Sequence, residues 1–319
     1  MRRYLLTYSY IGSNFRGVQK NLDLEDKLKG DPESVQGILE IAIKRFKPAN
    51  CPKVVVSSRT DIGVHALENS AHVDLDHPQV DCPTWPEYML YGMNRYFSKA
   101  HADLWIKNIQ AVPDTFHARF SAKSRTYLYR LAILKPCQCQ DAINQYSISV
   151  PMGEWKRCCF IGNSNFDVDK VRKAASFFIG LKDFQAFTRP ASHHPEGYST
   201  IRHINEMTIT PGLPMINSIH DSRYNLYNFW DIVVNAKSFC YRQVRRMVAV
   251  LIAVAQNKIE LDEVKLMIED PQNNGWNPRA TTAPPHGLFL TKVEYDPQDL
   301  IIPKQTEEET TKEIRSICD

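Results

Sequence analysis

Long apolar runs are missing from this 319-residue sequence. The strongest run, residues 247–255, follows two arginines and is too short to cross a bilayer, so we expect no membrane segment. The N-terminus begins a strand-like pattern almost at once, which leaves no room for a cleavable signal of the usual length. A transit peptide that had already been removed would leave the same sequence.

The sequence also lacks a disulfide framework and a zinc-ligand pattern. Eight cysteines are few for a chain of this length. Cys137 and Cys139, like residues 158–159, lack the two-residue gap with which paired cysteines hold one metal ion. The adjacent histidines 193–194 point in different directions and make a poor metal site. We therefore expect reduced thiols and no metal.

A strong excess of one charge is absent as well. The net charge is +3, and because the tail from 304 to 319 holds more acids than bases, residues 1–303 carry +5. Proteins that depend on phosphate affinity alone tend to be far more basic. This balance permits a nucleic-acid partner without requiring one, so local arginine clusters must carry that argument. The tail itself is expected to be disordered.

The elements occur twice in the same order: strand, helix, strand, strand, helix, strand. This order is typical of two split β-α-β, or ferredoxin-like, units. The first unit is expected at residues 3–9, 31–46, 53–56, 70–76, 86–97 and 103–112. The second is expected at 125–134, a helix capped by Asp167, 201–211, 229–236, 241–256 and 287–295. The sequence thus predicts an α+β protein with an N-terminal half at 1–122 and a C-terminal half at 123–303.

A polar stretch at residues 57–67, between two apolar strands, contains the candidate catalytic group. Asp61 lies two residues from Arg59 and is followed by Gly63, which can adopt the dihedrals of a tight loop. A neighbouring guanidinium would favour the ionised carboxylate, which suggests a nucleophile or a base. The alternative is that Asp61 caps a turn and pairs with Arg59 for structural reasons. The apolar residues expected to shield the carboxylate from water are Ile62, Val64 and Leu67.

Residues 59–66, Arg-Thr-Asp-Ile-Gly-Val-His-Ala, resemble the signature loop of the tRNA pseudouridine synthase A family, which usually has alanine in place of Ile62. Further blocks resemble that family in its order, so that the similarity covers residues 4–295. The details are closest to the animal branch called pseudouridylate synthase-like. These further blocks lie at residues 34–37, 116–122, 125–130, 244–248 and 287–290.

The resemblance implies an isomerase that converts uridine in tRNA to pseudouridine. Its fold would be a composite, mainly antiparallel sheet with helices on one side and a central cleft. The reaction exchanges nothing with a second molecule, so no cofactor is needed. Asp61 would be the catalytic carboxylate, and it would either attack the sugar carbon or remove a ribose proton. The target nucleotide would be flipped out of its stack to reach it.

The resemblance also implies a set of residues that bind the substrate. Tyr127 would stack on the target base, although the alternating strand, taken without the resemblance, favours a core role. Arg245 would hold Asp61 ionised through two hydrogen bonds, and its alternative is a solvated arginine cluster. Arg59 would help displace the flipped base. Arg125 and Arg130 flank Tyr127 and suggest an edge that binds phosphate. The remaining candidates for contact with the RNA backbone are Arg119 and Arg202.

Two other functions stay open from the residues. A non-catalytic RNA-binding factor, such as an RNA chaperone or a ribosome-associated protein, could use the same fold. A glycoside hydrolase would need a second acid at roughly 5–9 Å, for which Asp74 and Asp76 are the candidates. The animal branch is associated with mitochondria, so that compartment is suspected, and the cytoplasm is the alternative. A homodimer is compatible with the resemblance.

Overall fold

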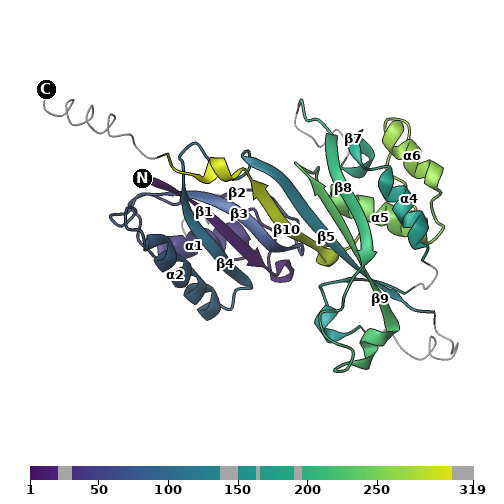
Figure 1. Cartoon of the computed structure of the whole chain (residues 1–319), viewed down its shortest axis with the longest axis horizontal. Helices are drawn as coiled ribbons and strands as arrows, with labels where there is room; N and C mark the ends of the chain where they lie inside the picture. The colour runs from purple at the N-terminus through teal and green to yellow at the C-terminus, as the bar shows by residue number, and fades with distance from the viewer. Residues whose placement is uncertain (21–30, 137–149, 163–165, 190–195, 304–319) are drawn as a thin grey trace, which may run out of the picture.

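The computed structural model describes residues 1–20, 31–136, 150–162, 166–189 and 196–303. The cysteines 137 and 139, the histidines 193–194 and the acidic tail lie outside these residues. A twisted sheet runs through the length of the molecule, with the N-terminal strands at one end and the strands of the second half at the other (Figure 1). The last strand, β10 (Leu288–Tyr295), lies between them.

The described residues form ten strands and five α-helices. The strands before β10 are β1 (Arg2–Tyr10), β2 (Val55–Val56), β3 (His65–Leu75), β4 (Leu104–Val112), β5 (Ala122–Leu134), β6 (Cys159–Ile161), β7 (Gly180–Asp183), β8 (Ile201–Pro211) and β9 (Tyr227–Ala236). The helices are α1 (Val35–Lys44), α2 (Trp85–Lys99), α4 (Val168–Ser176), α5 (Gln243–Ala255) and α6 (Leu261–Glu269). No helix of the described part of the chain is long and apolar enough to span a bilayer.

The strand order of the sheet is β4-β1-β3-β10-β5-β9-β8-β7, with β2 beside β3 and β6 beside β5. The pairs β3/β10 and β5/β6 are parallel, and the remaining pairs are antiparallel. The predicted α+β fold with a mainly antiparallel sheet is therefore confirmed. When the short strands β6 and β7 are set aside and the remaining strands are numbered within each half, β4-β1-β3-β2 and β10-β5-β9-β8 both follow the order fourth, first, third, second.

Alternation and capping explain the first elements. Tyr4, Leu6 and Tyr8 of β1 are buried, as the period of two predicts. The first helix begins at Val35, later than expected from the proline after Asp31. The side chain of Ser34 accepts a hydrogen bond from a backbone N–H of the first turn and fixes the start there.

The second half differs from the expected pattern in two ways. Helix α5 begins at Gln243, because Arg242 before it has a left-handed backbone with φ of 57° that cannot continue into a helix. The sequence pattern did not predict β6, β7 or α6. The predicted strand over residues 201–211 and the predicted cap at Asp167, which accepts hydrogen bonds from two backbone N–H groups, both agree with the structure.

One core cluster contains the buried residues of all five helices together with the inward residues of β1, β3, β5, β8 and β9. Residues of the opposite sheet face, such as Leu5 and Phe229, belong to two smaller clusters formed with loop residues. The helices of the described chain therefore contribute to one continuous core, with α2 against β4 and α4 against β8.

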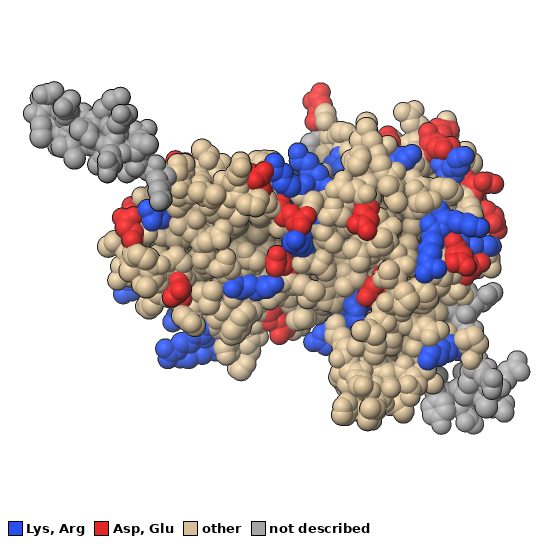
Figure 2. Space-filling model, in the orientation of Figure 1, with Lys and Arg blue, Asp and Glu red and all other residues tan. Residues whose placement is uncertain are grey.

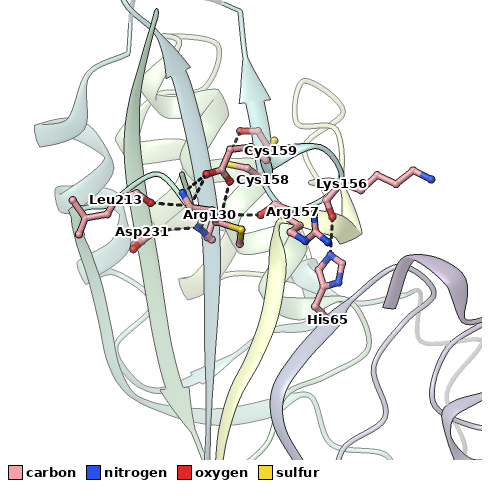
Figure 3. A network of polar contacts seen from close by, with 10 residues as sticks. His65, Arg130, Lys156, Arg157, Cys158, Cys159, Leu213 and Asp231 are labelled. Carbon is pink, nitrogen blue, oxygen red and sulfur yellow. Dashed lines mark hydrogen bonds and ion pairs between the residues drawn. The ribbon is translucent and has the colours of Figure 1, made fainter. Parts of the chain in front are cut away.

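Residues 150–162 and 212–228 form a side lobe next to β5 and β9 (Figure 1). At its base the guanidinium of Arg130 pairs with Glu154 at 2.6 Å and also donates to the carbonyl oxygens of Leu213 and Arg157 (Figure 3). Glu154 accepts a further hydrogen bond from the backbone N–H of Met215. These contacts join both lobe segments to the sheet.

Candidate active site

Asp61 lies in the loop that joins β2 to β3. Its backbone carbonyl oxygen accepts a hydrogen bond from the N–H of Val64 at 3.2 Å, which closes a tight turn. Gly63 within this turn has φ of 79°, and a Cβ there would lie 3.0 Å from Pro285. Only glycine fits this position without strain. The turn therefore holds Asp61 in one place.

The immediate sequence neighbours of Asp61 do not surround it as expected. Arg59 is exposed and forms no ion pair with Asp61 among the described contacts; the turn directs the carboxylate toward α5 instead. Ile62 and Leu67 are also exposed, so they do not shield the carboxylate. Leu67 lies on the solvent side of β3 because its neighbour Ala66 points into the core.

The partner of Asp61 is Arg245, from the first turn of α5. Its Nη1 donates to Oδ2 of Asp61 at 2.8 Å, and its Nε donates to the carbonyl oxygen of Ala283 at 2.8 Å. One hydrogen bond, rather than the two expected, therefore reaches the carboxylate, while the second fixes the guanidinium. Arg242 lies farther away, with its Nε 4.0 Å from the same carboxylate oxygen.

Asp61 and Arg245 face a cavity of about 600 Å³ between the two halves of the sheet. This volume is within the range of small-molecule sites. Of the predicted site residues, the cavity brings together Asp61, Arg59, Arg119, Arg125, Tyr127 and Arg245. Arg202 does not line it.

Tyr127 of β5 lies deep in this cavity. Its side chain is only 8% exposed, and its ring packs edge-on against Phe239 at 5.2 Å. Burial raises the pKa of Tyr127 to about 12, so its hydroxyl stays protonated at neutral pH. The two interpretations of this residue are compatible, because it belongs to the core and also lines the cavity.

Arg125 and Arg130 do not form an exposed phosphate-binding edge. Arg125 is buried, and its guanidinium donates to Oγ of Ser58 at 2.9 Å and to the carbonyl oxygen of Arg119 at 2.9 Å. Arg130 is occupied by Glu154 in the side lobe. Arg125 and Arg130 differ in parity along β5 and so point to protein partners on different elements, which the sequence pattern did not reveal. Arg125 thus ties β5 to the loop that carries Asp61.

The other two predicted arginines lie at the edges of the site. Arg119 lines the cavity, with its guanidinium carbon 5.6 Å from the ring centroid of Phe120. Arg202 lies 5.5 Å from the ring centroid of Tyr198, which does line the cavity, and donates to the carbonyl oxygens of Ser199 and Ile201. Any contact of Arg202 with substrate would therefore be peripheral.

Sequence reasoning missed several lining residues. Tyr241 presents its ring to two guanidinium groups, Arg189 at 5.5 Å and Arg242 at 4.9 Å. A signal was present, since only Gln243 separates Tyr241 and Arg242 from the block that contains Arg245. Phe120 was missed although it follows Arg119 in another recognised block.

The cavity is strongly cationic. Asp61 is the acidic residue among those that line it, so neither Asp74 nor Asp76 supplies a second carboxylate there. Such a site favours an anionic ligand. No group of three or more potential metal ligands was found among the described residues. On the face shown in Figure 2, basic and acidic side chains are interspersed, as the modest net charge suggests. The cationic lining residues are Arg59, Arg119, Arg125, Arg189, Lys237, Arg242 and Arg245.

The chain is similar in sequence to known proteins over most of its length. Residues 174–296 match the model of a family described as tRNA pseudouridine synthase. The chain is 35% identical over 298 residues to tRNA pseudouridine synthase-like 1 of Xenopus laevis, with 93% of each chain covered. It is 33% identical to the Homo sapiens protein of the same name, over 92% of this chain and 90% of that one. It is 31% identical to tRNA pseudouridine synthase A of Ehrlichia canis, over 92% and 100%. The chain therefore belongs to the tRNA pseudouridine synthase family, a family of isomerases.

Proposed function

We propose that this protein isomerises uridine to pseudouridine in tRNA, with Asp61 as the catalytic carboxylate. The observation that carries the proposal is the pair between Asp61 and Arg245, which faces a cationic cavity of about 600 Å³. A guanidinium that donates to a carboxylate fixes the direction of that carboxylate. It can then act on the sugar of a bound nucleotide.

The reaction needs few groups. The bond between N1 of uracil and C1′ of ribose breaks, the base turns over, and C5 bonds to the same C1′. The proton from C5 is lost while N1 gains one, so atoms and electrons balance within the nucleotide and the solvent. Asp61 acts either as the nucleophile at C1′ or as the base that removes a ribose proton. Both roles require its ionised form.

The neighbouring residues have complementary roles in this proposal. The target nucleotide is flipped into the cavity, and the buried ring of Tyr127 meets its base. Arg59, exposed beside Asp61, interacts with the RNA that the flipped base leaves behind. Arg125 positions the loop through its contacts to Ser58. The two split β-α-β halves, with their helices on one side, supply the two walls of the cleft.

Replacing Asp61 by asparagine tests the proposal. A set of tRNA transcripts without modifications would be incubated with protein in the absence of added metal or nucleotide, and pseudouridine would be measured. We expect the wild type to convert uridine, and Asp61→Asn to lose conversion by roughly a thousandfold or more while still binding tRNA.

The control is Asp76→Asn, which changes an exposed carboxylate that does not line the cavity and should keep full activity. Equal conversion by Asp61→Asn and wild type would contradict the role of Asp61. A wild-type protein that binds tRNA but makes no pseudouridine would instead favour a non-catalytic RNA-binding factor. Release of free uracil would point to a glycoside hydrolase.

The compartment and the oligomeric state are separate from this chemistry. A mitochondrial location, with the cytoplasm as the alternative, and homodimer formation both stay predictions from the resemblance. Comparing pseudouridine maps of organellar and cytosolic tRNA from cells with and without the protein would test the first. Sedimentation of the purified protein would test the second.

A further inference from the structure

Phe120 is an exposed aromatic side chain at the mouth of the cavity. Its side chain is 71% exposed although it lies in the turn between β4 and β5, where Phe116 and Ala118 are buried. Its ring is among those that line the cavity. A single exposed phenylalanine is common on protein surfaces, so exposure alone carries no argument. The evidence for a role is its position at the cavity and the side chains around it.

The ring of Phe120 is backed by other side chains. His117 lies against it with ring centroids 4.3 Å apart, and His117 in turn packs on His72 at 4.7 Å. The Nδ1 atom of His117 accepts hydrogen bonds from the backbone N–H groups of Arg119 and Phe120, which fixes the turn. Phe120 is therefore held outward by a rigid turn, with one part of its ring covered and the rest facing solvent.

The charges around this ring suit a nucleic acid. The guanidinium of Arg119 lies 5.6 Å from its centroid, and the charged residues that line the cavity are cations apart from Asp61. Exposed aromatic rings among arginines are the arrangement with which proteins bind unpaired bases, the ring stacking on the base and the cations meeting the backbone.

We propose that Phe120 stacks on an unpaired base that neighbours the flipped uridine in the tRNA. This inference rests on the proposed function. The depth of the two aromatic residues separates their roles, because Tyr127 is 8% exposed inside the cavity while Phe120 is 71% exposed at its mouth. The target base meets the deep ring and the next base meets the outer one. Phe120 is thus a binding residue for the RNA beside the target.

Substitutions at Phe120 test the role of the aromatic face. Affinity for the tRNA transcripts is measured in the Asp61→Asn background, where conversion is expected to be lost, and KM and kcat are measured with intact Asp61. We expect Phe120→Ala and Phe120→Leu to weaken binding and raise KM roughly 5- to 100-fold, the range for loss of one stacked base. Phe120→Tyr, which keeps the ring, should stay within about twofold. The melting temperature should hardly change, since the side chain is exposed.

Tyr91→Ala is the matched control. Tyr91 lies on α2, is 72% exposed and does not line the cavity, so its loss should leave binding unchanged. Equal affinity of Phe120→Ala and Tyr91→Ala proteins would overturn the proposal. So would a loss in Phe120→Ala that Phe120→Leu restores, because bulk rather than stacking would then matter.

A second measurement identifies the stacked base. Once the converted uridine is mapped, each neighbouring nucleotide is replaced in turn by an abasic site. At one position, removing the base should weaken binding to the protein that has Phe120. The same removal should change binding to the Phe120→Ala protein much less. Equal losses for both proteins at every position would overturn the proposal. Conversion by the wild type is measured separately, so failure here leaves the proposed function intact.

Discussion

Two arginine–carboxylate pairs of similar length occupy different environments in this protein. Arg245 and Asp61 lie 2.8 Å apart beside the cavity, with side chains 11% and 22% exposed. Arg130 and Glu154 lie 2.6 Å apart under the side lobe, with side chains 8% and 0% exposed. The sequence alone does not show that Arg245 lies at the cavity and that Arg130 lies under the side lobe.

The difference lies in what else each carboxylate contacts. Glu154 accepts from both Nη atoms of Arg130 and from the backbone N–H of Met215, so its oxygens are occupied within the protein. Asp61 has one hydrogen bond from Arg245, and it faces open volume. A fully bonded buried pair holds structure, whereas a partly bonded pair at a cavity is available for chemistry. The predictions below test this contrast.

The largest expected effect is on stability, at Glu154→Gln. This change leaves the guanidinium of Arg130 buried beside Asp231, at 4.0 Å, without its main partner. We expect the free energy of unfolding to fall by about 3–5 kcal/mol in urea titrations. The kcat of the folded fraction should stay within about twofold of wild type.

Glu68→Gln provides the comparison for that change. It breaks a more exposed pair with Lys107 and should cost less than about 1 kcal/mol. If Glu154→Gln were as stable as Glu68→Gln, the buried pair would not support the fold.

The next effect concerns His65, which lies at the start of β3 and contacts the side lobe. Its Nδ1 accepts from the N–H of Gly12 at 3.0 Å, and its Nε2 lies 2.9 Å from the carbonyl oxygen of Lys156 in the side lobe (Figure 3). A neutral ring with its proton on Nε2 satisfies both contacts. Burial lowers the pKa of His65 to about 4. The folded protein therefore binds this proton more weakly than the unfolded chain, whose histidine has a pKa near 6.5.

The contribution of His65 to the free energy of unfolding should therefore be fully present above about pH 6.5. It should be lost as the pH falls toward 4, by up to about 3 kcal/mol. His72, whose pKa is also lowered to about 4 by burial, adds a similar dependence. His65→Asn isolates the first, because its amide oxygen can accept from Gly12 but does not titrate. Urea titrations between pH 4 and 7 should give a flatter profile for the variant. Identical slopes would show that His65 does not titrate on unfolding.

The smallest effect is expected at Arg245, and it should appear in catalysis. Arg245→Gln removes the charged hydrogen bond to Asp61, which is worth roughly 1.5–3 kcal/mol, so kcat should fall roughly 10- to 100-fold. Arg246→Lys is the control, because Arg246 packs over Trp276 and does not line the cavity. It should leave kcat nearly unchanged. If both variants lost kcat equally, the pairing of Arg245 with Asp61 would not be specific to the reaction.

Much of the architecture could be predicted because it depends on local pattern. Alternation placed Tyr4 and Tyr8 inside, and residues 201–211 form the strand that they were expected to form. The start of α5 could not be predicted, since the left-handed backbone of Arg242 depends on its surroundings rather than on residue type. β6 and β7 were missed because strands of three and four residues carry too little periodicity.

The sequence by itself determined the catalytic candidate and its likeness to a family, because a run of residues 59–66 is specific even without contacts. Only the tertiary structure decided which arginine meets Asp61. Arg59 is two residues away and points elsewhere, while Arg245 is 184 residues away and pairs with it. The physical reason is that the direction of a side chain follows from the backbone turn and from packing between the two halves. Separation along the sequence determines neither the turn nor the packing.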